Sequence, residues 1–67
     1  MLGEDHREVM RAIQRLPQRR REAVILRYYL DLGDTEIAQT MGISEVSVRS
    51  TISRALRTLG HLLEEDA

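Results

Sequence analysis

The sequence predicts an all-α fold of four helices, and three observations support this prediction. Apolar residues recur at a spacing near 3.6 through most of the 67 residues. No run alternates between apolar and polar residues, and no Asn-Gly or Asp-Gly pair marks a hairpin. Pro17, Gly33 and Gly42 divide the chain into segments of helical length. A chain of this size forms one small domain, which we expect to occupy positions 1–67.

Proline separates the first two helices. We expect the first over Asp5–Arg15, with Val9, Ile13 and Leu16 on its apolar face. It ends there because the residue before a proline disfavours helix, whereas Pro17 fits the first position of the second helix, which we expect to reach Leu30. The buried side chains of that helix come from the set Ala23, Val24, Leu26, Tyr28 and Leu30.

The third helix is expected between two glycines. Gly33 suits a left-handed cap for the second helix. Asp34 suits the N-cap of the third, where its carboxylate can accept from free backbone N–H groups. The inner face of the third helix then holds Ile37, Ala38 and Met41. Gly42 allows the positive φ of a sharp turn, and Ser44 caps the fourth helix.

The fourth helix has an unbroken apolar seam and an opposite polar face. The seam residues lie four, three, four and three positions apart: Val48, Ile52, Ala55, Leu59 and Leu62. At about 100° per residue, the opposite face holds arginines, small hydroxyl side chains and one valine: Val46, Arg49, Ser50, Ser53 and Arg57, with Arg54 at the edge. A short helix, a glycine turn and such a second helix form a helix-turn-helix, whose second helix suits the major groove of DNA.

The charges are unevenly distributed, although the net charge is only −1. Residues 11–27 hold six arginines against one glutamate, and residues 44–61 hold three arginines against one glutamate. A local basic face is enough for contact with phosphates, whatever the total charge of the chain. The distribution therefore agrees with a nucleic-acid partner.

Several other classes of function lack support in the sequence. The chain has no cysteine, and His6 and His61 lie near opposite ends, so we expect no metal and no cofactor. Because no catalytic Ser/His/Asp or Cys/His arrangement and no glycine-rich phosphate loop is present, we expect no enzyme and no small-molecule substrate. No apolar run approaches the ~20 residues of a membrane span and no signal-peptide pattern opens the chain, so we expect a cytoplasmic protein without membrane contact.

Several motifs, in order, resemble region four of bacterial sigma factors, most closely that of the extracytoplasmic-function group. The resemblance covers residues 16–60 through these segments: Leu16-Pro17, Arg19–Val24, Leu26–Tyr29, Asp31-Leu32, Glu36–Ala38, Met41–Ser44, Ser47–Ser50 and Ser53–Leu56. The group often has Gly-Thr where this chain has Val46-Ser47, and Arg where it has Thr51. These differences bear on the base preference rather than on the binding mode.

The resemblance implies sequence-specific binding of double-stranded promoter DNA at the minus-thirty-five element, as the C-terminal domain of an RNA polymerase sigma factor in transcription initiation. It also implies contact with the polymerase core, at the flap of the β subunit, and with an anti-sigma factor. Because no segment that binds and melts the downstream promoter element is present, we expect a domain excised from a longer sigma factor. The base-contacting positions of the family map onto Arg49, Ser50, Ser53 and Arg54.

The chemistry of these side chains suggests roles in base readout. Arg49 or Arg54 suits the bidentate contact to guanine O6 and N7, worth about 1–3 kcal/mol of discrimination. Ser50 and Ser53 can donate to bases or phosphates, and the outward Val46 can contact a thymine methyl.

Phosphate contacts are expected where the helices begin, because helix N-termini attract phosphates. Thr35 lies at the start of the third helix, and Ser44 and Ser47 lie at the start of the fourth. Arg57 and Arg27 are weaker phosphate candidates.

Two alternatives remain. The effector domain of a response regulator shares the Glu-Ile-Ala helix, but usually opens with Leu-Thr where this chain has Leu16-Pro17, and it has a lysine after the position of Val48. The second alternative is a protein-interaction module held by an anti-sigma factor or an adaptor. Its partner would contact exposed apolar residues, namely Val46, Tyr29 and Leu63.

Overall fold

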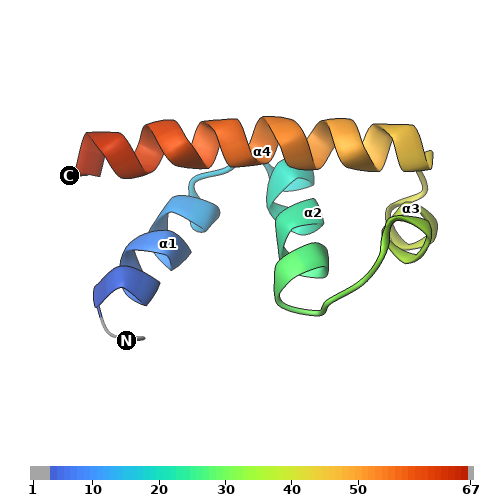
Figure 1. Ribbon diagram of the computed structural model, residues 1–67, viewed down its shortest axis with the longest axis horizontal. Helices are drawn as coiled ribbons and strands as arrows, with labels where there is room; N and C mark the ends of the chain where they lie inside the picture. Colours follow the sequence, from blue (N-terminus) through green and yellow to red (C-terminus); the bar gives the residue numbers. More distant parts are fainter. Residues whose placement is uncertain (1–3, 67) are drawn as a thin grey trace.

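The computed structural model describes residues 4–66, with side chains for residues 6–65. It consists of four helices, namely α1 Glu4–Gln14, α2 Gln18–Tyr28, α3 Asp34–Met41 and α4 Glu45–Asp66 (Figure 1). The all-α prediction is confirmed, and residues 4–66 contain no strand. The domain measures 34 × 21 × 14 Å. Within the same residues, no helix combines the length and apolar character needed to cross a membrane.

Helix α4 extends along the whole domain, and the other three helices pack on one side of it (Figure 1). Helix α1 packs near the C-terminal end of α4, whereas α3 packs near its N-terminal end (Figure 1). Helix α2 lies between them and contacts both. The first half of α4 therefore forms the helix-turn-helix with α3, while its second half anchors α1.

The core consists of two clusters of buried apolar side chains, and α2 contributes to both. The first cluster joins α1, α2 and the second half of α4 through Ala12, Ile13, Leu16, Val24, Ala55 and Leu59. The second lies beneath the helix-turn-helix and contains Ala23, Ile37, Ala38, Val48 and Ile52. The predicted apolar seam of α4 is confirmed, with Leu62 partly buried at its end. No polar side chain is buried among the described residues.

The boundaries of α2 differ from the prediction. Pro17 precedes the helix as its N-cap instead of starting it, and the Pro17 carbonyl accepts from the Arg21 N–H at 2.9 Å. The helix ends at Tyr28 rather than at Leu30. Tyr28 and Leu30, expected among the buried residues, are 57% and 59% exposed, because α2 fills the core with the adjacent pair Ala23 and Val24.

The connection from α2 to α3 corrects two further predictions. Gly33 is extended, with φ −84° and ψ 174°, and it is the N-cap of α3 in place of Asp34. The left-handed residue is Asp31, with φ 58°, since aspartate is among the few non-glycine residues that tolerate this region. The Gly33 N–H donates to Oε1 of Glu36 at 3.1 Å, which fixes the start of α3. Asp34 becomes the first helical residue, and its carboxylate is available to α2 and α4.

The turn from α3 to α4 confirms the prediction. Gly42 is left-handed, with φ 72° and ψ 34°, and its N–H donates to the Ala38 carbonyl at 2.8 Å. Ser44 caps α4, because its Oγ accepts from the Ser47 N–H at 3.0 Å and its carbonyl accepts from the Val48 N–H at 3.0 Å. This cap fixes the angle at which α4 leaves the turn.

Replacing Ser44 with alanine should lower the free energy of unfolding by about 1 kcal/mol, because the Ser47 N–H loses its acceptor. In a domain of this size the midpoint of thermal unfolding should fall by about 4–8 °C, as measured by circular dichroism. Ser53→Ala is the matched control, since Ser53 lies exposed in the interior of α4, where alanine is the better helix former. Equal midpoints for the two variants would contradict the capping role.

Candidate nucleic-acid interface

The predicted outer face of α4 lies on the molecular surface. Its exposed members are Val46, Arg49, Ser53, Arg54 and Arg57. Val46 is 67% exposed, although its side chain is apolar. Ser50 is half-buried and therefore presents less of its side chain. Five of the six residues predicted for this face are thus exposed, and the sixth is partly accessible.

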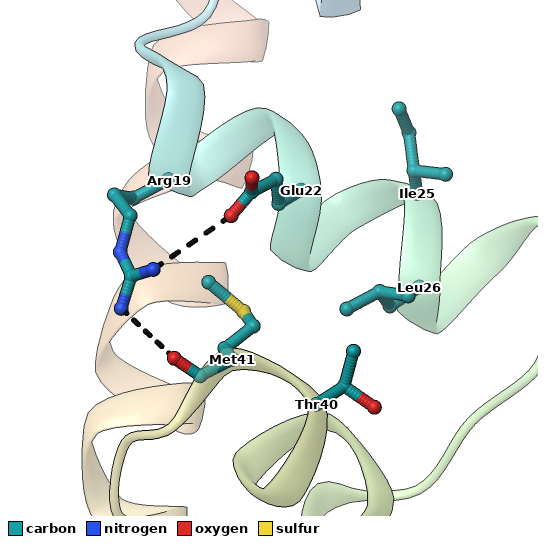
Figure 2. Close-up of a pocket in the computed structure, with 6 residues that line it drawn as sticks. All are labelled: Arg19, Glu22, Ile25, Leu26, Thr40 and Met41. Atoms are coloured by element: carbon teal, nitrogen blue, oxygen red, sulfur yellow. Dashed lines mark hydrogen bonds and ion pairs between the residues drawn. The ribbon is translucent and has the colours of Figure 1, made fainter.

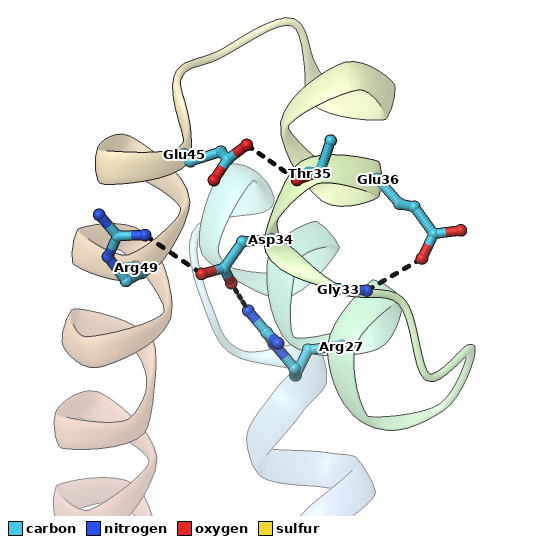
Figure 3. Close-up of polar contacts among 7 residues, drawn as sticks. All are labelled: Arg27, Gly33, Asp34, Thr35, Glu36, Glu45 and Arg49. Carbon is cyan, nitrogen blue, oxygen red and sulfur yellow. Dashed lines mark hydrogen bonds and ion pairs between the residues drawn. The ribbon is translucent and has the colours of Figure 1, made fainter.

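Arg49 is held by an ion-pair cluster that the sequence analysis missed (Figure 3). Arg49 Nη1 donates to Asp34 Oδ2 at 3.3 Å. The other carboxylate oxygen, Oδ1, accepts a hydrogen bond from Arg27 Nη2. One carboxylate at the start of α3 therefore joins an arginine from α2 and an arginine from α4. The hydrogen bond from Arg27 is the main cause that holds the pKa of Asp34 below its ordinary value, and Arg49 adds to it.

The Asp34 cluster makes stability depend on pH. The pKa of Asp34 is lower in the folded domain than in the unfolded chain, where it is about 3.9. The carboxylate therefore contributes its full stabilisation when the pH is above the unfolded-state pKa. This contribution is lost as the pH falls through the folded-state pKa. Asp34→Asn removes the titrating group. The difference in thermal midpoint between the wild type and this variant should therefore shrink between pH 6 and pH 2, as measured by circular dichroism. A difference that stays constant over this range would contradict the assignment.

The hydroxyl groups predicted to contact phosphates gather where α3 and α4 begin. Thr35 Oγ1 donates to Glu45 Oε2 at 2.8 Å, which links the two helix starts (Figure 3). Ser44 Oγ donates to Ser47 Oγ at 3.0 Å. All three predicted hydroxyls thus make hydrogen bonds within the domain, and Glu45 adds a negative charge beside them. Glu45 escaped the sequence analysis because nothing in the spacing indicates that it reaches α3.

The remaining predicted arginines fall into two groups. Arg54 and Arg57 are exposed, and their side chains have no hydrogen bond or ion pair among the described residues. Arg27, in contrast, is half-buried and bonded to Asp34. It lies in a groove between α2 and α4 that Arg49 and Ser53 also line. Arg54 and Arg57 are therefore the arginines of this face that are most available to a ligand.

The arginines at the start of α2 contact neighbouring elements. Arg19 Nη2 donates to the Met41 carbonyl at 3.3 Å, and Nη1 lies 3.8 Å from Glu22 Oε1, at the edge of a groove between α2 and α3 (Figure 2). Arg20 Nη1 donates to Thr58 Oγ1 of α4 at 3.2 Å, and Arg21 Nη1 donates to a carbonyl of α1 at 3.2 Å. Three consecutive basic side chains thus connect α2 to each of the other helices.

The residues expected to suit a protein partner are not equally available. Tyr29 and Val46 are exposed, although the Tyr29 hydroxyl donates to Met10 Sδ at 2.9 Å. Leu63 is half-buried against the first core cluster, contrary to the expected exposure, because the apolar seam of α4 extends to this position. Tyr29 lines a groove between α1, α2 and α4 together with two further exposed side chains, Tyr28 and Leu56.

The fold and the exposed face of α4 define a helix-turn-helix domain. The family described as "Sigma-70, region 4" matches residues 6–59. The chain therefore belongs to this family, whose members are non-catalytic domains of transcription initiation factors. The match decides against the response-regulator alternative.

Named relatives agree with this assignment. The chain is 34% identical over 61 residues to the RNA polymerase sigma factor SigF of Mycobacterium tuberculosis, covering 90% of this chain and 23% of the relative. It is 39% identical over 56 residues to the ECF RNA polymerase sigma factor BldN of Streptomyces coelicolor, covering 84% of this chain and 21% of the relative. It is 30% identical over 60 residues to the RNA polymerase sigma-F factor of Kitasatospora aureofaciens, covering 88% and 20%.

The chain thus spans only 20–23% of the length of these relatives. No solved structure gives a significant match to it.

Proposed function

We propose that this chain binds the minus-thirty-five element of promoter DNA, with the first half of α4 in the major groove, as the C-terminal domain of a sigma factor. The observation that carries the proposal is the outer face of α4. Exposed Arg49, Ser53 and Arg54 lie opposite a seam that is buried against the rest of the domain. Because the seam and the Ser44 cap fix α4, its polar face is presented as a rigid unit.

The exposed residues divide into two kinds of contact. The first turns of α4 contact the bases through Val46, Arg49, Ser50, Ser53 and Arg54. Phosphate contacts come from Thr35, Ser44, Ser47, Arg57 and Arg27. Arg54 combines exposure with the absence of an ion pair among the described residues, so it has the most freedom to reach a guanine. Arg57 lies about one turn further along α4, where it suits the backbone better than the bases.

The proposal includes protein partners. In this role the domain acts in the cytoplasm and contacts the RNA polymerase core at the flap of the β subunit. An anti-sigma factor competes with these partners for the surface of the domain. Besides the outer face of α4, the apolar groove between α1, α2 and α4 suits a protein partner, because Tyr28, Tyr29 and Leu56 are exposed along it. If a protein partner covers the face of α4 as well, titrating that partner lowers the affinity for DNA.

The test is fluorescence anisotropy of the 67-residue chain on labelled duplexes, after selection of a preferred sequence from a randomised pool. The selected duplex and a scrambled duplex of equal composition are compared at low and moderate salt. The proposal predicts tighter binding of the selected duplex at both salt concentrations, and weaker binding of both duplexes as salt rises. Equal affinity for both duplexes, or no binding at low salt, would overturn it in favour of the protein-interaction module.

A further inference from the structure

Asp34 stands between two arginines of the proposed DNA-binding face (Figure 3). Each carboxylate oxygen serves a different arginine, with Oδ1 accepting from Arg27 and Oδ2 from Arg49. The Asp34 side chain is only 27% exposed, whereas that of Arg49 is 58% exposed. The carboxylate is thus fixed in the first turn of α3, and the arginine it holds reaches into solvent.

This geometry restrains Arg49 without using up its hydrogen-bonding capacity. A free arginine side chain carries about 2 kcal/mol of rotamer entropy, which is lost when a base fixes it. Asp34 contacts Arg49 through a single nitrogen, Nη1. Because a guanidinium has five N–H donors, the other donors stay available for a base edge. An arginine restrained in this way loses less entropy on binding than a free one.

The same carboxylate lowers the attraction of this region for phosphate. Two arginines share one carboxylate, so the cluster presents a single excess positive charge. Nonspecific binding depends mainly on the number of phosphates that cations neutralise. Contact with guanine O6 and N7, in contrast, depends on directional hydrogen bonds. A carboxylate beside Arg49 therefore weakens nonspecific binding to DNA more than it weakens binding to the preferred sequence.

We propose that Asp34 is a specificity-determining positioning residue, which holds Arg49 for base contact and suppresses its contact with phosphates. The inference rests on the proposed function, since it concerns the quality of DNA recognition. Arg27 contributes to this role, because its hydrogen bond to Oδ1 holds the Asp34 carboxylate in place beside Arg49. Removing the charge of Asp34 should therefore strengthen binding to a scrambled duplex and weaken discrimination between duplexes.

The test compares Asp34→Asn with Glu45→Gln in the anisotropy assay, using the selected and scrambled duplexes. Both variants remove one negative charge from the helix starts, but the described contact of Glu45 is with the Thr35 hydroxyl rather than with an arginine. For D34N, the ratio of the two affinities should fall about tenfold, within the range for one arginine–guanine contact. The salt dependence on the scrambled duplex should become steeper by about one phosphate contact. E45Q should change both affinities by the same factor.

If Asp34 had only a structural role, D34N would change the affinity ratio whether or not Arg49 is present. D34N is therefore repeated in the Arg49→Ala background, where it should leave the affinity ratio unchanged if it acts through Arg49. Circular dichroism confirms folding, and Asp34→Ser, which also removes the charge, replaces D34N if the asparagine variant does not fold. An undiminished ratio, or an equal fall with and without Arg49, would overturn the inference. No discrimination by the wild type would instead overturn the proposed function.

Discussion

Replacing Ile37 with alanine should leave the domain close to unfolded. Ile37 is fully buried at the centre of the second core cluster, between α2 and α4. Truncation of a buried isoleucine costs about 2–5 kcal/mol, because the removed methyl groups leave a cavity. At about 0.05–0.15 kcal/mol per residue, a chain of this length has little stability in reserve. Urea denaturation followed by circular dichroism should therefore show most of the wild-type stability lost.

The loss from Ile37→Ala should also remove the helix-turn-helix, since the same cluster holds α3 against α4. Val46→Ala is the matched control, because it also shortens a branched apolar side chain but at an exposed position of α4. Substitutions at such surface positions usually change stability by less than about 0.5 kcal/mol. Comparable losses for the two variants would mean that the second core cluster does not organise the fold.

Arg54→Ala should abolish much of the preference between duplexes. If Arg54 donates to guanine O6 and N7, its loss should cost about 1–3 kcal/mol of discrimination, or about 5–150-fold in the affinity ratio. Arg49→Ala should have an effect of the same kind. Anisotropy on the selected duplex and on its single-base variants measures both effects.

Arg57→Ala is the control for base readout. It is also exposed on α4, but as a phosphate contact it should weaken binding to every duplex by a similar factor and reduce the salt slope by about one. Arg54→Ala and Arg57→Ala should unfold at similar temperatures, because both arginines are exposed and neither has an ion pair among the described residues. If Arg54→Ala and Arg57→Ala had the same effect on all duplexes, Arg54 would be a phosphate contact.

The parts of the fold set by local rules were predictable from the sequence. The seam from Val48 to Leu59 repeats regularly over three turns, so its burial follows from periodicity alone. Gly42 and Ser44 adopt the conformations that their residue types favour, and no tertiary contact opposes them. The exposed face of α4 follows from the same periodicity, which is why the candidate site was largely recognisable.

The parts that escaped prediction depend on contacts between helices. Asp34 is a favourable N-cap residue, yet Gly33 takes that position because Glu36 binds its N–H while two arginines bind the Asp34 carboxylate. Those arginines lie seven residues before and fifteen residues after Asp34, so no local pattern reveals them. Tyr28 was misplaced for a similar reason, since only the packing of α2 between two clusters decides which of its faces is covered.

Guanine analogues can establish whether the exposed face of α4 contacts base edges in the major groove. Each guanine of the selected duplex is replaced in turn by 7-deazaguanine, which lacks the N7 acceptor. If an arginine of this face donates to guanine N7, at least one replacement should weaken binding by the wild type but cause no further loss in Arg49→Ala or in Arg54→Ala. Wild-type affinity that is unchanged by every replacement, or losses that persist fully in both variants, would contradict this contact.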